Sequence, residues 1–156
     1  MGLKREDGMS IEIILIAGLP GSGKSMLMEA LKREGWLIFD DFKANAFNDS
    51  SIFWHSRNYK TLLMALHEGQ KCIVADIDFC KATSRHEAEK VLREQIAEIT
   101  LEWLFFENDF HACQANIMRR ASQSIEDNLR ALNEYRAQYQ IPIGMRVIPV
   151  WRSGEG

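Results

Sequence analysis

The sequence contains no apolar stretch that approaches the length of a transmembrane helix, and we predict no signal peptide at its start. Its three cysteines, Cys72, Cys80 and Cys113, are an odd number without C-x-x-C spacing. Positive charge is not in excess, because the formal net charge is −3. These absences argue against a membrane protein, a disulfide-rich secreted domain and a broad surface for long nucleic acids. We therefore expect a cytoplasmic protein with free thiols.

Repeats, low-complexity tracts and long linkers are also lacking. The 156 residues suit one domain of ordinary size, and the hydrophobic fraction of 46% is normal for a globular protein. Met9 and Ser10 suit a native start, so we interpret residues 1–8 as a leader or an added extension. Residues 9–156 are expected to form a single domain.

A phosphate-loop motif is the most specific feature of the sequence. Residues 18–25 read Gly-Leu-Pro-Gly-Ser-Gly-Lys-Ser and match G-x-x-x-x-G-K-[ST] without a gap. An apolar, β-branched run at 11–17 precedes the motif, and a helical pattern at 26–34 follows it, so the motif has the strand–turn–helix context that it requires. Backbone N–H groups of such a turn surround a phosphate, and the helix N-terminus adds partial positive charge. The motif therefore predicts a site for a nucleoside triphosphate.

Each position of the motif has an expected role. Lys24 would reach the β- and γ-phosphates as a catalytic cation, and the Ser25 hydroxyl would be a ligand of Mg²⁺. The other residues that we expect to bind the nucleotide are Gly18, Pro20, Gly21, Ser22, Gly23 and Met26.

The rest of the sequence alternates between strand and helix patterns. This alternation predicts a three-layer α/β fold with a five-stranded, mainly parallel sheet. The further strands are expected at 36–39, 71–75, 99–106 and 146–150, and Pro149 indicates that the last strand is at an edge. The further helices are expected to carry Ile52 to Leu66 and end at Gly69, to open at the capping box 84–87, and to cover about 109–121 and 124–139.

Acidic residues follow two of these strands at their carboxyl ends, where open α/β sheets bind ligands. Asp40 and Asp41 follow the second strand, and a carboxylate there can accept the proton of an attacking hydroxyl; the alternative is that both cap a turn. Asp76 ends the third strand in a Walker B arrangement near Mg²⁺, with Asp78 as the alternative ligand. Lys43 is a candidate contact for an anionic acceptor or else a solvated surface lysine.

Arg119 and Arg120 lie in the helical segment after the fourth strand. Cations are needed over a transferred phosphoryl group because its charge spreads over several oxygens. We interpret residues 109–139 as an arginine-bearing helical lid, with a solvated helix face as the alternative. For Arg130 and Arg136 we favour the solvated face.

The order of these motifs resembles the small P-loop kinases that include zeta-type toxins, polynucleotide 5′-kinase domains and related predicted AAA-type ATP-binding proteins. The resemblance covers the chain from Ser10 onward. It implies that Asp40 activates the acceptor hydroxyl, that Lys43 contacts the acceptor, that Asp76 is the strand-three acid and that Arg119 or Arg120 is the lid cation. Polynucleotide kinases usually carry arginine where Lys43 stands, so the acceptor is not implied.

We predict a kinase that uses ATP and Mg²⁺ to phosphorylate a hydroxyl of a small molecule or nucleotide, without extended nucleic acid or membrane as a partner. One alternative is a regulatory nucleotide-binding ATPase or switch without an acceptor. The other is a kinase of nucleic-acid 5′-hydroxyl ends, against which the net negative charge argues.

Overall fold

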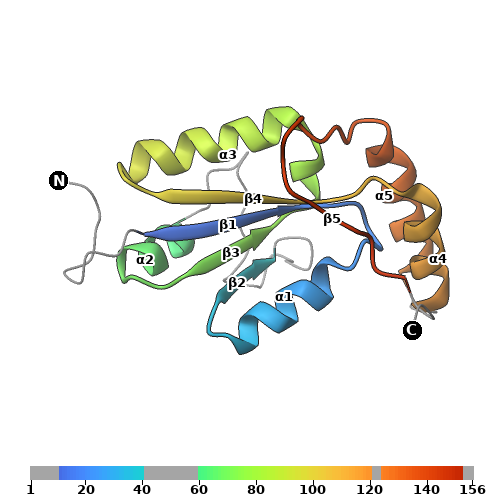
Figure 1. Ribbon diagram of the computed structural model, residues 1–156, viewed down its shortest axis with the longest axis horizontal. Helices are drawn as coiled ribbons and strands as arrows, with labels where there is room; N and C mark the ends of the chain where they lie inside the picture. Colours follow the sequence, from blue (N-terminus) through green and yellow to red (C-terminus); the bar gives the residue numbers. More distant parts are fainter. Residues whose placement is uncertain (1–10, 41–59, 121–123, 153–156) are drawn as a thin grey trace.

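Strands and helices alternate along the chain in a computed structural model that describes residues 11–40, 60–120 and 124–152 (Figure 1). The strands are β1 (Glu12–Ala17), β2 (Leu37–Asp40), β3 (Cys72–Ala75), β4 (Thr100–Phe106) and β5 (Val147–Ile148). The helices are α1 (Lys24–Arg33), α2 (Lys60–His67), α3 (Ala82–Gln95), α4 (Phe110–Arg120) and α5 (Ile125–Arg136), and the 3₁₀ helix η2 (Ile77–Cys80) lies between β3 and α3.

The described residues contain one sheet, in the order β2-β3-β1-β4-β5. Each neighbouring pair is parallel, so the predicted mainly parallel sheet is parallel throughout. β1 lies at the centre, between β3 and β4, and its last residue, Ala17, pairs with Phe105. The loop that follows β1 therefore leaves from the middle of the carboxyl-terminal edge of the sheet.

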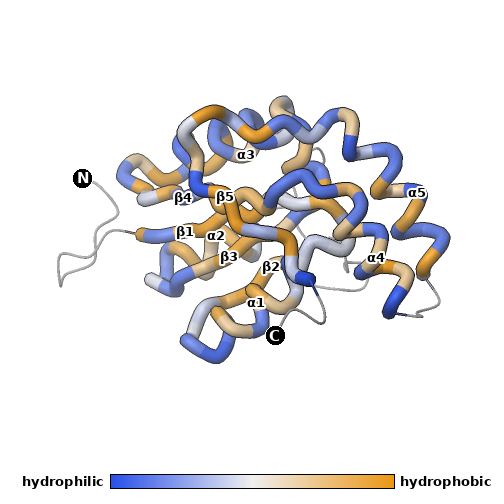
Figure 2. The backbone as a smooth tube through the Cα atoms, turned by 45° about the vertical axis from the view of Figure 1, so that its right-hand side comes forward, coloured by the Kyte–Doolittle hydropathy of each residue, from blue (hydrophilic) through white to orange (hydrophobic). Residues whose placement is uncertain are grey.

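Alternate residues of β1 face opposite sides of the sheet, as the two-residue period of a strand requires. Ile13 and Leu15 belong to a core cluster that includes residues of α2 and α3, whereas Ile14 and Ile16 belong to a second cluster with Met28 of α1. The sheet is thus covered on both faces, which is the predicted three-layer arrangement. The central strands are mainly hydrophobic, apart from the polar residues near the starts of β1 and β4, whereas the helices alternate between hydrophobic and hydrophilic residues (Figure 2).

The hairpin of α4 and α5 lies beyond the carboxyl ends of the strands rather than over the middle of the sheet (Figure 1). Its two helices contact each other, and α5 ends at Arg136, three residues before the predicted boundary at 139. The start of the helix predicted from Ile52 lies outside the described residues. Its end is as predicted, because Gly69 has φ 86° and its N–H donates to the Leu66 carbonyl at 3.0 Å.

The predicted capping box at 84–87 is wrong. Helix α3 begins at Ala82, after Lys81 in an extended conformation, so Ser84 lies inside the first turn. Packing sets this boundary, because the buried guanidinium of Arg85 donates to the Phe79 carbonyl at 2.7 Å and to the Gln140 carbonyl at 3.0 Å. Those two bonds connect the start of α3 with η2 and with the segment after α5.

The last predicted strand is shorter than expected, since β5 covers only Val147–Ile148. It is an edge strand, as Pro149 indicates, because it pairs with β4 alone in the described sheet. Cys72, Cys80 and Cys113 are free thiols and are buried, as the prediction of unpaired cysteines requires. Among the described helices, none is long and apolar enough to cross a membrane.

Candidate functional site

The predicted phosphate loop connects β1 to α1 and packs directly against α4. Gly21 and Gly23 have φ values of 83° and 107°, which L side chains rarely adopt. A Cβ atom at Gly21 would lie 2.5 Å from the Cys113 carbonyl oxygen and 2.9 Å from Cγ1 of Ile117. Glycine is therefore required at position 21 both by the backbone conformation and by the close approach of α4.

The backbone of this loop presents hydrogen-bond donors. Across the described ranges, the N–H groups of Gly21 and Gly23 have no protein acceptor, whereas the N–H of Ser22 donates to the Leu19 carbonyl at 3.2 Å. The first turn of α1 contains no acidic residue that would neutralise the positive end of the helix. An anion at the loop would thus meet unused N–H donors and an uncompensated helix N-terminus.

The Ser22 side chain belongs to the interior rather than to this anion site. Ser22 is 1% exposed, and its hydroxyl has no hydrogen-bond partner in the described part of the chain. Leu19 and Pro20 are buried as well. The motif predicts that Ser22 and Pro20 contribute to nucleotide binding. Because their side chains are buried, they would do so through the conformation of the loop backbone.

Lys24 and Ser25 begin α1 and are both half-buried. The Lys24 ammonium group donates to the Gly18 carbonyl and so lies over the loop. Burial raises the pKa of the Cys80 thiol to about 11 and that of the Cys113 thiol to about 12. The nearby charge of Lys24 lowers both pKa values and so partly offsets this rise. At neutral pH both thiols are therefore protonated.

The acid predicted near the metal lies at the same edge of the sheet. Asp76 directly follows β3 and is 4% exposed, and its Oδ1 accepts the Asp78 N–H at 2.8 Å at the start of η2. Asp78, the alternative ligand, accepts the Tyr135 hydroxyl proton at 2.6 Å and is thereby connected to α5. Asp76 directly follows Ala75, which pairs with Ile16 near the end of β1. Of the two acids, Asp76 is therefore the one closer to the start of the phosphate loop along the sheet edge.

The other predicted acids are only partly described. Asp40 is the last residue of β2, and its backbone pairs with Ala75, so it ends its strand beside Asp76. The conformation of its side chain is not described. Asp41 and Lys43 lie outside the described residues, and their roles remain predictions.

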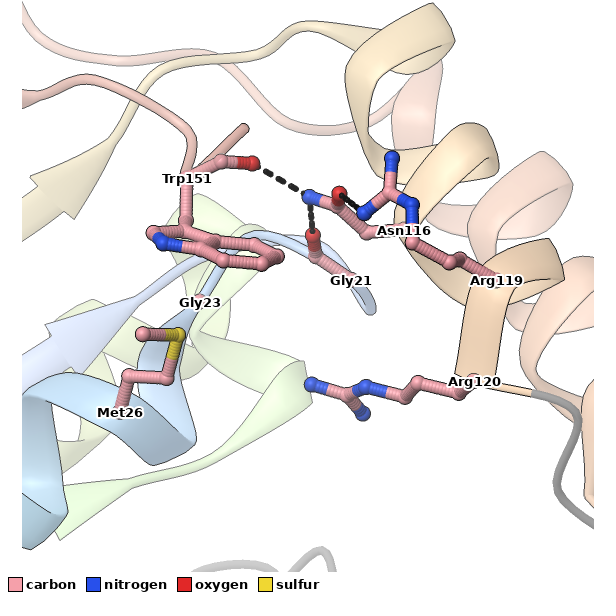
Figure 3. Close-up of a pocket in the computed structure, with 7 residues that line it drawn as sticks. All are labelled: Gly21, Gly23, Met26, Asn116, Arg119, Arg120 and Trp151. Atoms are coloured by element: carbon pink, nitrogen blue, oxygen red, sulfur yellow. Dashed lines mark hydrogen bonds between the residues drawn. The ribbon is translucent and has the colours of Figure 1, made fainter. Parts of the chain in front are cut away.

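A cavity of about 310 Å³ lies between the phosphate loop, α1 and α4. Arg119 and Arg120 both border it, so the structure brings the predicted lid cations to the predicted nucleotide site (Figure 3). Met26, also predicted to bind the nucleotide, is 50% exposed on the α1 side. The residues that line the cavity are Gly21, Gly23, Met26, Asn116, Arg119, Arg120 and Trp151.

The sequence analysis did not identify Trp151 or Asn116. The Trp151 side chain is 43% exposed, and the Arg119 guanidinium lies 5.9 Å from the centre of its ring. The Trp151 N–H donates to the Ser22 carbonyl at 3.1 Å, which holds this residue against the phosphate loop. One sequence signal was available for each: Trp151 directly follows the last apolar strand, and Asn116 precedes Arg119 by one helical turn.

These features together suit a nucleoside triphosphate. The unused N–H donors, Lys24 and the two arginines can neutralise a chain of phosphates, and the indole ring of Trp151 offers a flat surface for a base. A buried carboxylate, Asp76, ends the adjacent strand, where oxygen ligands for a hard cation are needed.

Neither a protein-family model nor a curated protein matches the chain. Solved structures do match it. A gluconokinase from Sinorhizobium meliloti 1021 is 18% identical over 91% of this chain and 84% of its own, with a TM-score of 0.57. A fungal RNA kinase is 14% identical over 93% of this chain and 76% of its own, with a TM-score of 0.65. An APS kinase from Mycobacterium tuberculosis, solved with AMPPNP and APS, is 17% identical over 91% and 90%, with a TM-score of 0.54.

At such identities the likeness concerns the fold. It confirms the predicted α/β class and the resemblance to small P-loop kinases at that level. The chain thus has the parallel α/β fold that these P-loop kinases share.

Proposed function

We propose that this protein is a kinase that transfers the γ-phosphoryl group of ATP to a hydroxyl of a small molecule or nucleotide. The observation that carries the proposal is the meeting of the phosphate loop with a cavity bordered by Arg119 and Arg120. The likeness of the fold to sugar, RNA and APS kinases supports it. ATP as the donor also suits the cytoplasmic location that the sequence predicts.

In this proposal the triphosphate lies along the N–H groups of Gly21 and Gly23, with Lys24 as the cation for its β- and γ-phosphates. The base occupies the cavity against the Trp151 ring. Arg119 is already hydrogen-bonded to Asn116 at 2.9 Å, whereas Arg120 has no hydrogen-bond or ion-pair partner among the described residues. Arg120 is therefore our choice for the cation that stabilises charge on the transferred group.

Ser25 and Asp76 would hold Mg²⁺, which prefers hydroxyl and carboxylate oxygens. The described residues contain no group of three acidic, histidine or cysteine side chains that could form an all-protein site. We therefore propose that the phosphate oxygens of the nucleotide supply further ligands. When bound, Mg²⁺ would neutralise negative charge on those oxygens.

Asp40 is our candidate for the general base, because it ends β2 at the edge where Asp76 directly follows β3. A carboxylate at this position can orient the acceptor hydroxyl and take its proton as the new P–O bond forms. Asp41 and Lys43 follow it in sequence, and Lys43 is our candidate contact for the acceptor.

A screen of hydroxyl acceptors with labelled ATP, including a 5′-hydroxyl oligonucleotide, tests the proposal. We expect Asp40→Asn to leave the dissociation constant for ATP nearly unchanged and to lower transfer to the true acceptor by about 10²- to 10⁴-fold. Asp41→Asn is the matched control and should lose less, and Lys24→Ala should abolish tight ATP binding. Slow hydrolysis with every acceptor, indifferent to both aspartate substitutions, would contradict a kinase and favour a nucleotide switch.

A further inference from the structure

Asn116 is a buried amide at the back of the cavity. It lies on α4 and is 4% exposed. Its Nδ2 group donates to the Gly21 carbonyl at 2.8 Å and to the Trp151 carbonyl at 2.5 Å, and its Oδ1 accepts from the Arg119 guanidinium at 2.9 Å (Figure 3). Both amide hydrogens and the oxygen are therefore used, so its hydrogen-bonding capacity for a ligand is largely spent within the protein.

The three partners of Asn116 come from three separate parts of the chain. Gly21 belongs to the phosphate loop, Arg119 to the end of α4, and Trp151 to the segment after β5. All three also line the cavity. A single side chain thus connects the loop expected to bind phosphates with the ring expected to contact the base.

The bonds from Asn116 restrict the conformations of two of these partners, Gly21 and Trp151. Gly21 has a positive φ, and a glycine backbone has more conformational freedom than that of other residues, so the bond to its carbonyl restricts the loop before any ligand binds. Trp151 follows the short edge strand β5, and the bond to its carbonyl keeps the indole ring at the rim of the cavity. Fixing a site in advance lowers the entropic cost of binding.

We propose that Asn116 is a positioning residue that holds the phosphate loop and the base cavity in one arrangement, so that the two ends of a nucleotide bind in a coupled way. This inference rests on the proposed nucleotide site and concerns a residue that need not touch the nucleotide. Loss of its amide donors should weaken binding at both ends.

The variant Asn116→Asp tests this directly. It replaces the amide donors with a carboxylate oxygen that faces the carbonyl oxygens of Gly21 and Trp151, whereas the contact with Arg119 is kept. We expect the dissociation constants for both Mg²⁺–ATP and inorganic tripolyphosphate to rise by about 10- to 100-fold. Trp151→Leu, which removes only the ring, should weaken ATP binding and leave tripolyphosphate binding unchanged.

Asn128→Asp is the matched control. Asn128 is likewise a buried helical asparagine, 9% exposed on α5, but it does not line the cavity. Calorimetric titration of each variant with both probes, together with its melting temperature, separates a positioning role from general destabilisation. Asn116→Ser, which shortens the side chain without adding a negative charge beside the anion site, is measured alongside and should show the same pattern. It also serves as the test if Asn116→Asp does not fold.

Weaker binding of both probes in Asn116→Asp and also in the uncharged Asn116→Ser, at melting temperatures similar to that of Asn128→Asp, supports the proposal. Unchanged binding of tripolyphosphate overturns it, because the loop would then not depend on Asn116. A wild-type protein that binds both probes yet phosphorylates no acceptor refutes the kinase function and leaves this test intact.

Discussion

At the scale of single residues, two neighbouring positions of the phosphate loop, Gly21 and Ser22, are tightly packed. Gly21 leaves no room for a Cβ atom against the Cys113 carbonyl. Next to it, the Ser22 hydroxyl is enclosed without a hydrogen-bond partner among the described residues. A buried hydroxyl without a partner loses its bonds to water and gains none in return. We therefore expect the Ser22 hydroxyl to lower the stability of the fold.

We expect Ser22→Ala to raise the free energy of unfolding by about 1 kcal/mol, because it removes the enclosed hydroxyl and leaves the backbone unchanged. Urea-induced unfolding measures this change. Ser25→Ala is the control, since Ser25 is half-buried at the start of α1 and should have little effect on stability. A less stable Ser22→Ala protein would show that the hydroxyl has a partner in solution.

The two acids after β3 differ in their surroundings, and the difference can be measured. Asp76→Asn keeps an oxygen that can accept the Asp78 N–H, so the fold should survive. We expect this variant to weaken ATP binding in the presence of Mg²⁺ more than in its absence, because a neutral amide is a poor ligand for the cation. Asp78→Asn should change both affinities equally, if at all. A reversed result would assign the metal to Asp78.

At the scale of elements, the N-terminus of α4 determines where the cavity residues lie. Asp109 precedes the helix, and its Oδ1 accepts the Ala112 N–H at 3.0 Å. Its other oxygen accepts from Arg152, which also donates to Glu107 at 3.0 Å.

Arg152, the residue next to Trp151, is thus attached to the start of the helix that carries Asn116 and Arg119. One carboxylate therefore both caps α4 and fixes the segment after β5.

We expect Asp109→Ala to lower the free energy of unfolding by about 1 kcal/mol at neutral pH, as for the loss of other N-terminal caps. Donation from the Ala112 N–H, and secondarily from Arg152, lowers the pKa of Asp109 in the folded protein. Its charge therefore contributes stability above its unfolded pKa of about 3.9, and this contribution is lost as the pH falls through the lower folded value.

Thermal unfolding from neutral pH to below pH ~3.9 measures this dependence. The difference between wild type and Asp109→Ala should shrink in acid. Asp109→Asn, which keeps the capping oxygen without the charge, should fall between the two at neutral pH and vary as little with acidity as Asp109→Ala. A difference that stays constant with pH would contradict a role for the charge.

At the scale of the whole molecule, the segment that follows α5 is connected to the strand ends that carry the site. The buried Tyr139 hydroxyl donates to the carbonyls of Phe106, at the end of β4, and of Ala17, at the end of β1. These bonds join residues that are far apart in sequence, and one of them, Ala17, immediately precedes the phosphate loop. Tyr135 makes a second connection, through its bond to Asp78. The helical hairpin is thereby attached to two places on the same edge of the sheet.

We expect Tyr139→Phe to lower the free energy of unfolding by about 1–2 kcal/mol, because it removes a buried hydroxyl whose single hydrogen is shared by two carbonyls. Burial raises the pKa of Tyr139 well above its usual value. Its contribution is therefore complete below the unfolded pKa of about 10 and is lost as the pH rises through the folded value.

Denaturant unfolding between neutral pH and pH ~11 checks both expectations. Wild type should lose more stability in alkali than Tyr139→Phe. Tyr135→Phe is the comparison, and we expect a smaller loss at neutral pH because Tyr135 is half-buried and water can replace its bond. Equal losses in the two variants would argue against a special role for the connection at Ala17 and Phe106.

The fold class, the strand–loop–helix at residues 11–33 and the order of the parallel strands along the chain could all be predicted from the amino-acid sequence. These features depend on local chemistry: the period of apolar residues, the glycines of the loop, and a glycine such as Gly69 that ends a helix. The acids at the ends of β2 and β3 could also be predicted, because the carboxyl ends of parallel strands share one edge.

The cavity and the exact starts of the helices depend on packing between distant parts of the chain and could not be predicted. Trp151 and Asn116 meet Gly21 only because β5 joins the sheet beside β4 and the hairpin of α4 and α5 lies beyond the strands. The start of α3 was predicted wrongly for the same reason, since the buried Arg85 forms its bonds with Phe79 and Gln140 from elsewhere in the chain. Contacts between residues so distant in sequence leave no periodic pattern, and so only the packed molecule reveals them.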